Sequence, residues 1–143
     1  MSEINLNSKL EPEDFSTQLF DWGRIKWRIS PDRIAGASMT VGDVILYPGK
    51  GHDRHNHPDS DEMIYVISGR GEQMLGDTAP FPVAAGDLFY IPKGVYHSTR
   101  NLGWEPMHLV VVYTPGGAEA GLRTLPDFRE APVGQTVSMA NAG

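Results

Sequence analysis

Two histidines and a glutamate lie close together near the middle of the chain, in a stretch rich in glycine and polar residues. His55 and His57 are two residues apart, so on an extended strand their imidazoles project from the same face. Pro58 then bends the chain, and Glu62 begins an apolar run over residues 63–67 that is typical of a strand. Two imidazoles and a carboxylate brought together in this way suit a divalent metal ion of borderline hardness. The alternative is a polar loop with two hydrated histidines, because such a motif needs a matching structural context.

A second stretch, residues 86–101, supplies a third histidine. Residues 88–91 form a short apolar run that predicts a strand, and the Pro92-Lys93-Gly94 sequence after it predicts a turn. His97 follows this turn, near the start of the next predicted strand. The second stretch therefore provides the context that the first one lacks on its own.

Together the two stretches resemble the cupin superfamily. The first matches the cupin pattern G-x5-H-x-H-x4-E-x6-G at Gly49, His55, His57, Glu62 and Gly69. The second matches G-x5-P-x-G-x2-H-x3-N at Gly86, Pro92, Gly94, His97 and Asn101. The resemblance covers about residues 38–115, and no position departs from the pattern. It implies one divalent transition metal ion per chain with four ligands: His55, His57, Glu62 and His97.

The implied ligand set leaves the identity of the metal open. A tetrahedral zinc ion with four protein ligands is a closed, structural site. An octahedral ion with the same ligands keeps two positions for water, dioxygen or two oxygens of one substrate. Three neutral imidazoles and one carboxylate leave a divalent ion with a net positive charge, which favours an anionic or chelating ligand. Iron, manganese, nickel and zinc all tolerate these ligands, so the order of affinities does not choose between them.

The composition narrows the range of partners. The 143 residues suit a single domain, and the formal net charge is −6 with the twelve lysines and arginines scattered along the chain. Nucleic acid is therefore not an expected partner, because phosphate binding needs a concentrated basic surface. No apolar run is long enough to span a membrane, and the first residues lack the order of a signal peptide. The absence of cysteine excludes thiolate chemistry and fits a cytoplasmic protein.

The remaining pattern predicts an all-β fold. In residues 24–29 apolar and basic residues alternate, which is the clearest half-buried strand in the chain. Residues 15–22 fit either a short helix or an extended arm. Further strands are expected at residues 38–47, 70–75 and 106–114, with a proline-broken edge or connecting strand at residues 79–85. Many short strands punctuated by glycine and proline favour a barrel or sandwich. The resemblance implies the cupin form, a double-stranded β-helix or jelly-roll barrel.

The chain divides into three expected parts. Residues 1–37 are predicted to form an N-terminal arm and strand that pack on the barrel or on a dimer partner. Residues 38–115 form the cupin barrel, and residues 116–143 form a C-terminal tail. Leu122, Leu125 and Phe128 give this tail side chains to bury, either over the barrel or across to a second subunit. We expect a homodimer, because strand 24–29 carries an apolar stripe and cupins commonly pair two barrels.

Several residues near the predicted ligands are candidates for other roles. Strand alternation places Ile64 and Val66 on the side of Glu62, and Thr99 and Asn101 on the side of His97. Gln73 is a weak catalytic candidate that offers an amide to a substrate or else faces solvent. His108 is a second weak candidate, either a base in the pocket or a hydrogen-bonded structural histidine. His52, Asp53 and Arg54 precede the first ligand on a loop, where they are solvated or rim the barrel mouth. The acid and base residues stay unassigned.

Three functions are compatible with these residues. An oxygenase would chelate a diketone, enol or related small substrate on the metal and activate it toward dioxygen. A lyase or isomerase would use the metal as a Lewis acid on a keto sugar or hydroxy acid. A sensor or storage module would bind a small molecule without turnover. Cupins include all three, so the fold does not choose. We place the oxygenase first, because it needs the fewest protein groups besides the metal.

Overall fold

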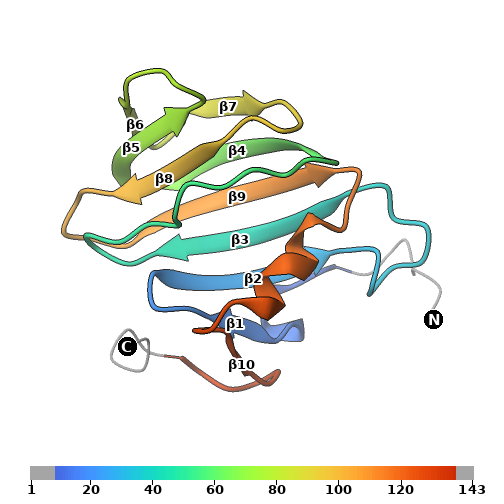
Figure 1. Cartoon of the computed structure of the whole chain (residues 1–143). Coiled ribbons are helices and arrows are strands. Elements are labelled where there is room, and N and C mark those ends of the chain that lie inside the picture. Colours follow the sequence, from blue (N-terminus) through green and yellow to red (C-terminus); the bar gives the residue numbers. More distant parts are fainter. Residues whose placement is uncertain (1–8, 138–143) are drawn as a thin grey trace.

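The computed structural model describes residues 9–137 and consists mainly of β-strands in two sheets (Figure 1). A seven-stranded sheet has the order β10-β1-β2-β3-β9-β4-β7, and a three-stranded sheet has the order β6-β5-β8. The strands are β1 (Thr17–Leu19), β2 (Gly23–Ile29), β3 (Thr40–Leu46), β4 (Asp61–Ser68), β5 (Arg70–Leu75), β6 (Phe81–Ala84), β7 (Leu88–Ile91), β8 (His97–Asn101), β9 (Met107–Thr114) and β10 (Arg129–Ala131). Two short 3₁₀ helices are η1 (Pro12–Asp14) and η2 (Ala118–Thr124). The predicted all-β jelly-roll fold is confirmed.

The alternation of side chains in the large sheet builds the core. In β2, Ile25 and Trp27 are buried, while the basic residues that alternate with them, Arg24, Lys26 and Arg28, are only partly buried. Strand β9 lies between β3 and β4, antiparallel to both, and every second residue from Met107 to Tyr113 is buried. These inward side chains pack in one cluster with Val83 of the small sheet. The hydrophobic effect thus fixes which face of each strand lines the barrel interior.

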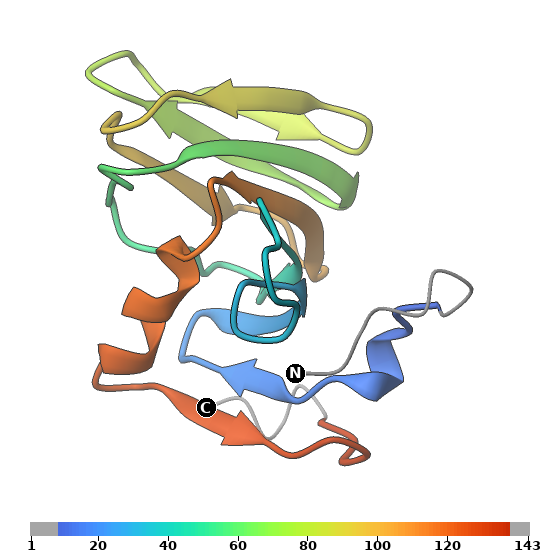
Figure 2. The ribbon, with the colours of Figure 1, turned by 90° about the vertical axis from the view of Figure 1, so that its right-hand side faces the viewer.

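The arm and the tail join the same large sheet as the barrel strands. Strand β1 pairs with β2 on one side and with β10 on the other, so the region of residues 15–22 includes a strand rather than a helix. Leu122, Leu125 and Phe128 pack against the core of their own chain. Helix η2 lies along one side of the barrel in Figure 2. Residues 1–8 and 138–143, the outer ends of the predicted arm and tail, lie outside the described residues.

Two residues of the motifs, Gly69 and Asn101, have structural roles that require their residue types. Gly69 turns the chain from β4 into β5 with φ of 88°, and a Cβ there would lie 2.9 Å from the Cα of Met107. Only glycine adopts this conformation without strain and allows such a close approach. Asn101 is fully buried, and its amide donates hydrogen bonds to the carbonyls of Leu46 at 3.0 Å and Glu105 at 2.7 Å. It therefore ties β8 to the end of β3.

Among residues 9–137, neither of the two helices has the length and hydrophobicity that a membrane span requires.

Candidate metal centre

The structure brings the four predicted ligands together inside the barrel. One potential ligand atom from each of His55, His57, Glu62 and His97 lies within 4.8 Å of those of the other three. The two sheets both contribute, since Glu62 belongs to β4 and His97 to β8. His55 and His57 come from the segment between β3 and β4, which runs beside β8. His55 and His97 exchange backbone hydrogen bonds of 3.0 and 2.8 Å, which hold their side chains together.

A bulge in this segment shapes the site. Between the Gly51–Arg100 and His55–His97 bridges, the three residues 52–54 lie opposite only two, residues 98 and 99. An extra residue on one strand bends it and re-aims its side chains, a feature that is common beside active sites. Here the bulge places His52 against the ring of His55, with the ring centroids 4.0 Å apart.

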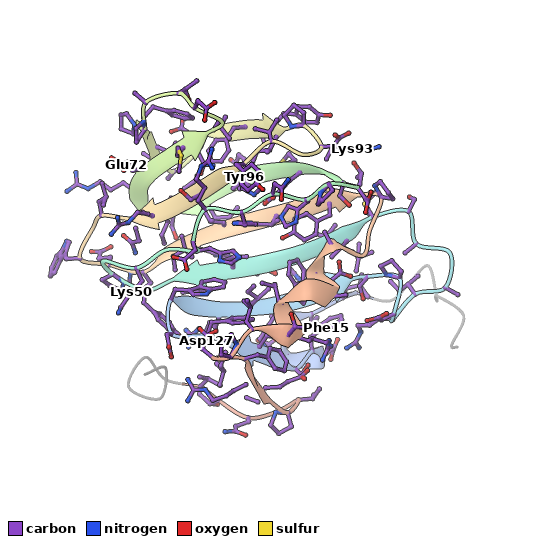
Figure 3. The ribbon with its side chains drawn as sticks, in the orientation of Figure 1. Phe15, Lys50, Glu72, Lys93, Tyr96 and Asp127 are labelled. Carbon is purple, nitrogen blue, oxygen red and sulfur yellow. The ribbon has the colours of Figure 1, made fainter. Side chains whose placement is uncertain are left out.

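The predicted alternation around the ligands is confirmed. Glu62 is 4% exposed, and Ile64 and Val66 are buried on the same side of β4. On β8, Thr99 and Asn101 are likewise buried on the side of His97. Tyr96, the residue before His97, is exposed instead and has the guanidinium of Arg54 over its ring at 4.7 Å (Figure 3). The carboxylate and the imidazole therefore meet in an interior from which water is largely excluded.

Backbone carbonyls fix the tautomers of two histidines. The Nδ1 atom of His55 lies 2.6 Å from the carbonyl of Asp53, and Nδ1 of His97 lies 3.0 Å from the carbonyl of Val95. Because a carbonyl only accepts, each Nδ1 carries the hydrogen and donates it. The Nε2 atom of each neutral ring is then left with a lone pair. Such an outer contact is the usual way in which a protein orients a metal-binding imidazole.

The centre of the cluster has the character of a cation site. Nε2 of His97 lies 2.8 Å and Nε2 of His57 lies 3.2 Å from the same oxygen, Oε1 of Glu62. All three atoms are buried, and none has a hydrogen-bond donor that would satisfy it. Lone pairs that face one another at these distances repel unless a positive charge, either a proton or a metal ion, lies between them. The donor set therefore fits a divalent metal ion.

The surroundings favour the ligand forms of His55 and Glu62 at neutral pH. Burial lowers the pKa of His55 to about 3, and the neighbouring rings of His52 and His97 act in the same direction. Burial raises the pKa of Glu62, but the imidazoles of His57 and His97 outweigh this effect and hold that pKa at about 2. His97 is also buried, which lowers its pKa, yet the carboxylate of Glu62 outweighs burial and raises it. His55 is therefore neutral and Glu62 ionised.

A small cavity of about 50 Å³ borders the cluster. Most of its wall is apolar and comes from the large sheet, while three of the four predicted ligands form one side. Tyr113 adds a phenol whose ring packs against His57 at 4.7 Å, and burial raises its pKa well above the ordinary value, so it stays neutral. The residues that line the cavity are Trp22, Ile25, Trp27, Val44, Leu46, His52, His55, Glu62, Ile64, His97, Thr99, Leu109, Val111, Tyr113 and Leu122.

Sequence reasoning did not place Trp22 at the site, and it left His52 either solvated or at the rim of the barrel mouth. The indole of Trp22 stacks on the ring of His52 at 4.7 Å with an interplanar angle of 14°, and His52 in turn contacts His55. Burial lowers the pKa of His52 to about 4, so its ring is neutral. No spacing in the sequence links Trp22 to His52, because the turn before β2 and the bulge after β3 bring them together only in three dimensions. Their residue types were the one available signal.

The two weak catalytic candidates lie elsewhere. Gln73 does not face solvent: it is fully buried on β5 and accepts a hydrogen bond from the hydroxyl of Thr99. Thr99 lines the cavity, whereas Gln73 does not. His108 faces the outer side of the large sheet, where its Nε2 lies 2.9 Å from Oδ1 of Asp43. Arg28 pairs with the other oxygen of Asp43 at 2.8 Å, so His108 belongs to a hydrogen-bonded surface network away from the cavity.

Comparison with known proteins agrees with this geometry. The family model described as "Cupin domain" matches residues 42–113, which include all four predicted ligands. The chain belongs to the cupin family. Protein SchB of Streptomyces halstedii is 31% identical to this cupin over 121 residues, which cover 85% of the chain and 83% of SchB. Polyketide synthase CurC of Streptomyces cyaneus is 33% identical over 93 residues, and the match covers 65% of the chain and 60% of CurC.

Further similar proteins include one of solved structure and two enzymes. A solved structure of a conserved double-stranded β-helix protein from Klebsiella pneumoniae superposes on this cupin with a TM-score of 0.60 at 25% identity, covering 77% of this chain and 84% of the other. Glucose-6-phosphate isomerase of Thermococcus kodakarensis is 34% identical across 58% of the chain and 49% of the isomerase. Oxalate decarboxylase OxdC of Bacillus subtilis is 32% identical across 56% of the chain and 20% of the decarboxylase. The family thus spans different reactions, and membership alone names none for this chain.

Proposed function

We propose that this cupin is a cytoplasmic metalloenzyme that acts on a small, oxygen-rich substrate, provisionally as an oxygenase. The proposed ligands of its single divalent ion are His55, His57, Glu62 and His97. The observation that carries the proposal is the buried Glu62 oxygen facing two imidazole nitrogens that lack donors, beside a small apolar cavity. No other group of three or more histidines, cysteines or carboxylates among residues 9–137 gathers in this way.

The protein groups support chemistry at an ion in a dry site. When bound, the metal supplies Lewis acidity and open positions for a chelating substrate or dioxygen. The carbonyls of Asp53 and Val95 orient two of the imidazoles through their Nδ1 hydrogens. Ile64 and Val111 belong to the apolar wall that keeps water from the reacting groups. We place oxygenase chemistry first, because it requires little of the side chains that line the cavity beyond the exclusion of water.

A Lewis-acid isomerase or lyase is the second candidate. The similarity to glucose-6-phosphate isomerase favours it, since that relative's name states an isomerisation of a sugar phosphate. This reaction needs no oxidant, but it does need a residue that moves a proton. A binding protein without turnover would need neither dioxygen nor a proton carrier, and ligand binding alone would then account for the cavity.

Metal loading in the presence and absence of dioxygen separates these functions. We expect about one divalent metal ion per chain by elemental mass spectrometry, since the cluster offers a single set of donors. Protein loaded separately with iron(II), manganese(II), nickel(II) and zinc is offered small diketones, hydroxy acids and keto sugars. The oxygenase predicts oxygen uptake coupled to substrate loss with iron and none with zinc, which has no redox chemistry.

Two results would contradict the oxygenase. Anaerobic turnover with zinc would support the isomerase or lyase, because zinc still polarises carbonyls. Thermal stabilisation by a ligand with no product under either condition would support a binding protein. A protein that takes up none of the four metals would contradict the metal centre itself.

We also propose that the protein is a homodimer, although on grounds that differ from the sequence expectation. The apolar stripe of β2 is buried in the core of its own chain and is therefore not free to bind a partner. The outer face of β4 and β7 instead presents an apolar patch. Tyr65 and Leu88 are directly paired across the two strands and are 38% and 61% exposed, with Tyr90 beside them at 60%. Contiguous exposed apolar side chains of this kind mark protein interfaces.

Light scattering at micromolar concentration should give twice the 15.7 kDa mass of the chain. The substitution Leu88→Lys should shift the protein toward the monomer, because a charge in a desolvated interface is costly. Trp104→Lys is the matched control, because Trp104 is 84% exposed and lies outside the patch. A monomeric wild-type protein, or a dimer that Trp104→Lys disrupts while Leu88→Lys does not, would contradict this interface.

A further inference from the structure

Residues from outside the matched cupin segment form part of the wall of the cavity beside the metal centre. The family model ends at residue 113, yet Leu122 of η2 lines the cavity. On the other side of the segment, Trp22 precedes β2 and also lines it. Part of the wall of the cavity therefore comes from outside the segment that carries the proposed ligands.

Hydrogen bonds hold the tail that carries Leu122 against β3 and against the arm. The carboxylate of Glu119, at the start of η2, is buried and accepts hydrogen bonds from the hydroxyl of Thr40 at 2.9 Å and from the amide of Gly117 at 3.0 Å. After η2, the carboxylate of Asp127, which is labelled in Figure 3, accepts a hydrogen bond of 3.0 Å from the backbone amide of Asp21, the residue before Trp22. Leu122 is thus fixed from both ends of its helix.

Aromatic packing joins the two halves of the wall. Phe20 is fully buried, stacks on Trp22 at 4.7 Å and contacts Phe128 of the tail at 5.9 Å. Trp22 continues this stack onto His52, which lies against the proposed ligand His55. The arm, the tail and the metal centre are therefore in continuous contact, and a change in the wall alters the space beside the ligands directly.

The size of the cavity limits what fits beside the ion. A buried water needs about 10–15 Å³ of such volume, and pockets for drug-sized ligands measure roughly 300–1,000 Å³. The 50 Å³ at this site accommodates only a few non-hydrogen atoms. A net positive charge at the ion favours an anionic chelator. These two properties together describe a short carboxylic acid with a second oxygen donor on the adjacent carbon.

We propose that Leu122 is a specificity-determining residue that, with Trp22, restricts this cupin to short 2-hydroxy or 2-oxo acids. The inference rests on the proposed metal centre and adds to it the substrate class and the residue that sets its upper size. Leu122→Ala removes the outer part of a wall side chain without touching a proposed ligand. The cavity then extends toward η2, and longer chelators fit.

The test uses a series of straight-chain 2-hydroxy acids of increasing length and does not depend on turnover. Cobalt(II) is loaded into the full-length protein, and its visible absorption spectrum is followed as each acid is added. Wild-type protein should bind the acids of about two to four carbons and discriminate at least about tenfold against six carbons, given the small cavity. Leu122→Ala should bind the six-carbon acid at least about tenfold more tightly than wild type, with little change for the shortest acid.

Matched variants separate a wall effect from a general loosening of the tail. Leu125→Ala makes the same chemical change in the same segment, but Leu125 packs against the core and does not line the cavity. The longest acid that the Leu125→Ala variant binds should therefore be the same as for wild type. If Leu122→Ala unfolds below the assay temperature, Leu122→Val provides a smaller change in the same direction. A normal cobalt spectrum with the same size limit in wild type and the Leu122 variants would overturn the inference alone. Absence of a cobalt spectrum in wild type would overturn the metal centre and the inference together.

Discussion

Glu62→Gln is expected to weaken the binding of a divalent metal ion at least about hundredfold. Loss of a residue that only hydrogen-bonds to a metal ligand and orients it costs about 10–100-fold in metal affinity. Glu62→Gln replaces the anionic ligand itself, so the loss should be larger. The glutamine keeps the shape of the side chain but carries no charge to balance the ion. Glu62 is buried among imidazoles, so no solvent anion is positioned to take its place. Competition with a chromophoric chelator measures the change in dissociation constant.

Three further variants make this prediction specific. His97→Ala should reduce metal affinity by a similar factor, because it removes a donor from the same cluster. His108→Ala makes the same substitution on the outer face of the sheet and should leave the affinity within about threefold of wild type. Glu72→Gln, on β5 outside the cluster, is the matched control for the carboxylate and should behave likewise. Near-equal affinity of wild type and Glu62→Gln would refute the ligand assignment.

Phe20→Ala should lower the free energy of unfolding by about 3–5 kcal/mol, the usual range for a fully buried aromatic side chain. Phe20 is 0% exposed and contacts both Trp22 and Phe128, so its removal leaves a cavity where the arm meets the tail. Trp22 and Phe128 belong to segments that are far apart in the sequence and precede β2 and β10, which limits how far their rings can collapse into the space. Urea denaturation followed by circular dichroism gives the difference in stability.

An exposed aromatic residue is the control for this prediction. Trp104 is 84% exposed, and Trp104→Ala should change the free energy of unfolding by no more than about 0.5 kcal/mol. A loss of less than about 1.5 kcal/mol in Phe20→Ala would mean that the arm and tail are not packed on the barrel in solution as they are in this structure.

Much of the barrel could be predicted because its signals are local. Alternation in residues 24–29 and the apolar run at residues 88–91 correspond to β2 and β7. The inward positions of Ile64 and Val66 followed from the orientation of Glu62 alone, since the period of a strand is two. The resemblance of the two motifs to the cupin pattern likewise implied a cluster of ligands whose atoms converge in the structure.

The features that sequence reasoning missed depend on contacts between distant segments. The pairing of β1 with β10 and the stacking of Trp22 on His52 leave no periodic pattern in either partner. The position of His108 could not be predicted for a different reason. It lies in a nearly continuous apolar strand, so the pattern alone did not show which face of the sheet it occupies. Its partner Asp43 lies on β3, and Arg28, which pairs with Asp43, lies on β2, so only the order of the strands reveals the network.

The pairing of β1 with β10 also has a consequence for how the protein is made. The hydroxyl of Ser16 hydrogen-bonds the carboxylate of Glu130 across 114 residues of chain, so this contact forms only after nearly all of the described chain has left the ribosome. Residues 55–97, which supply every proposed ligand, emerge earlier than Leu122 and β10. Because long-range pairings form late, the order of synthesis leaves an interval in which the metal can enter an unclosed barrel.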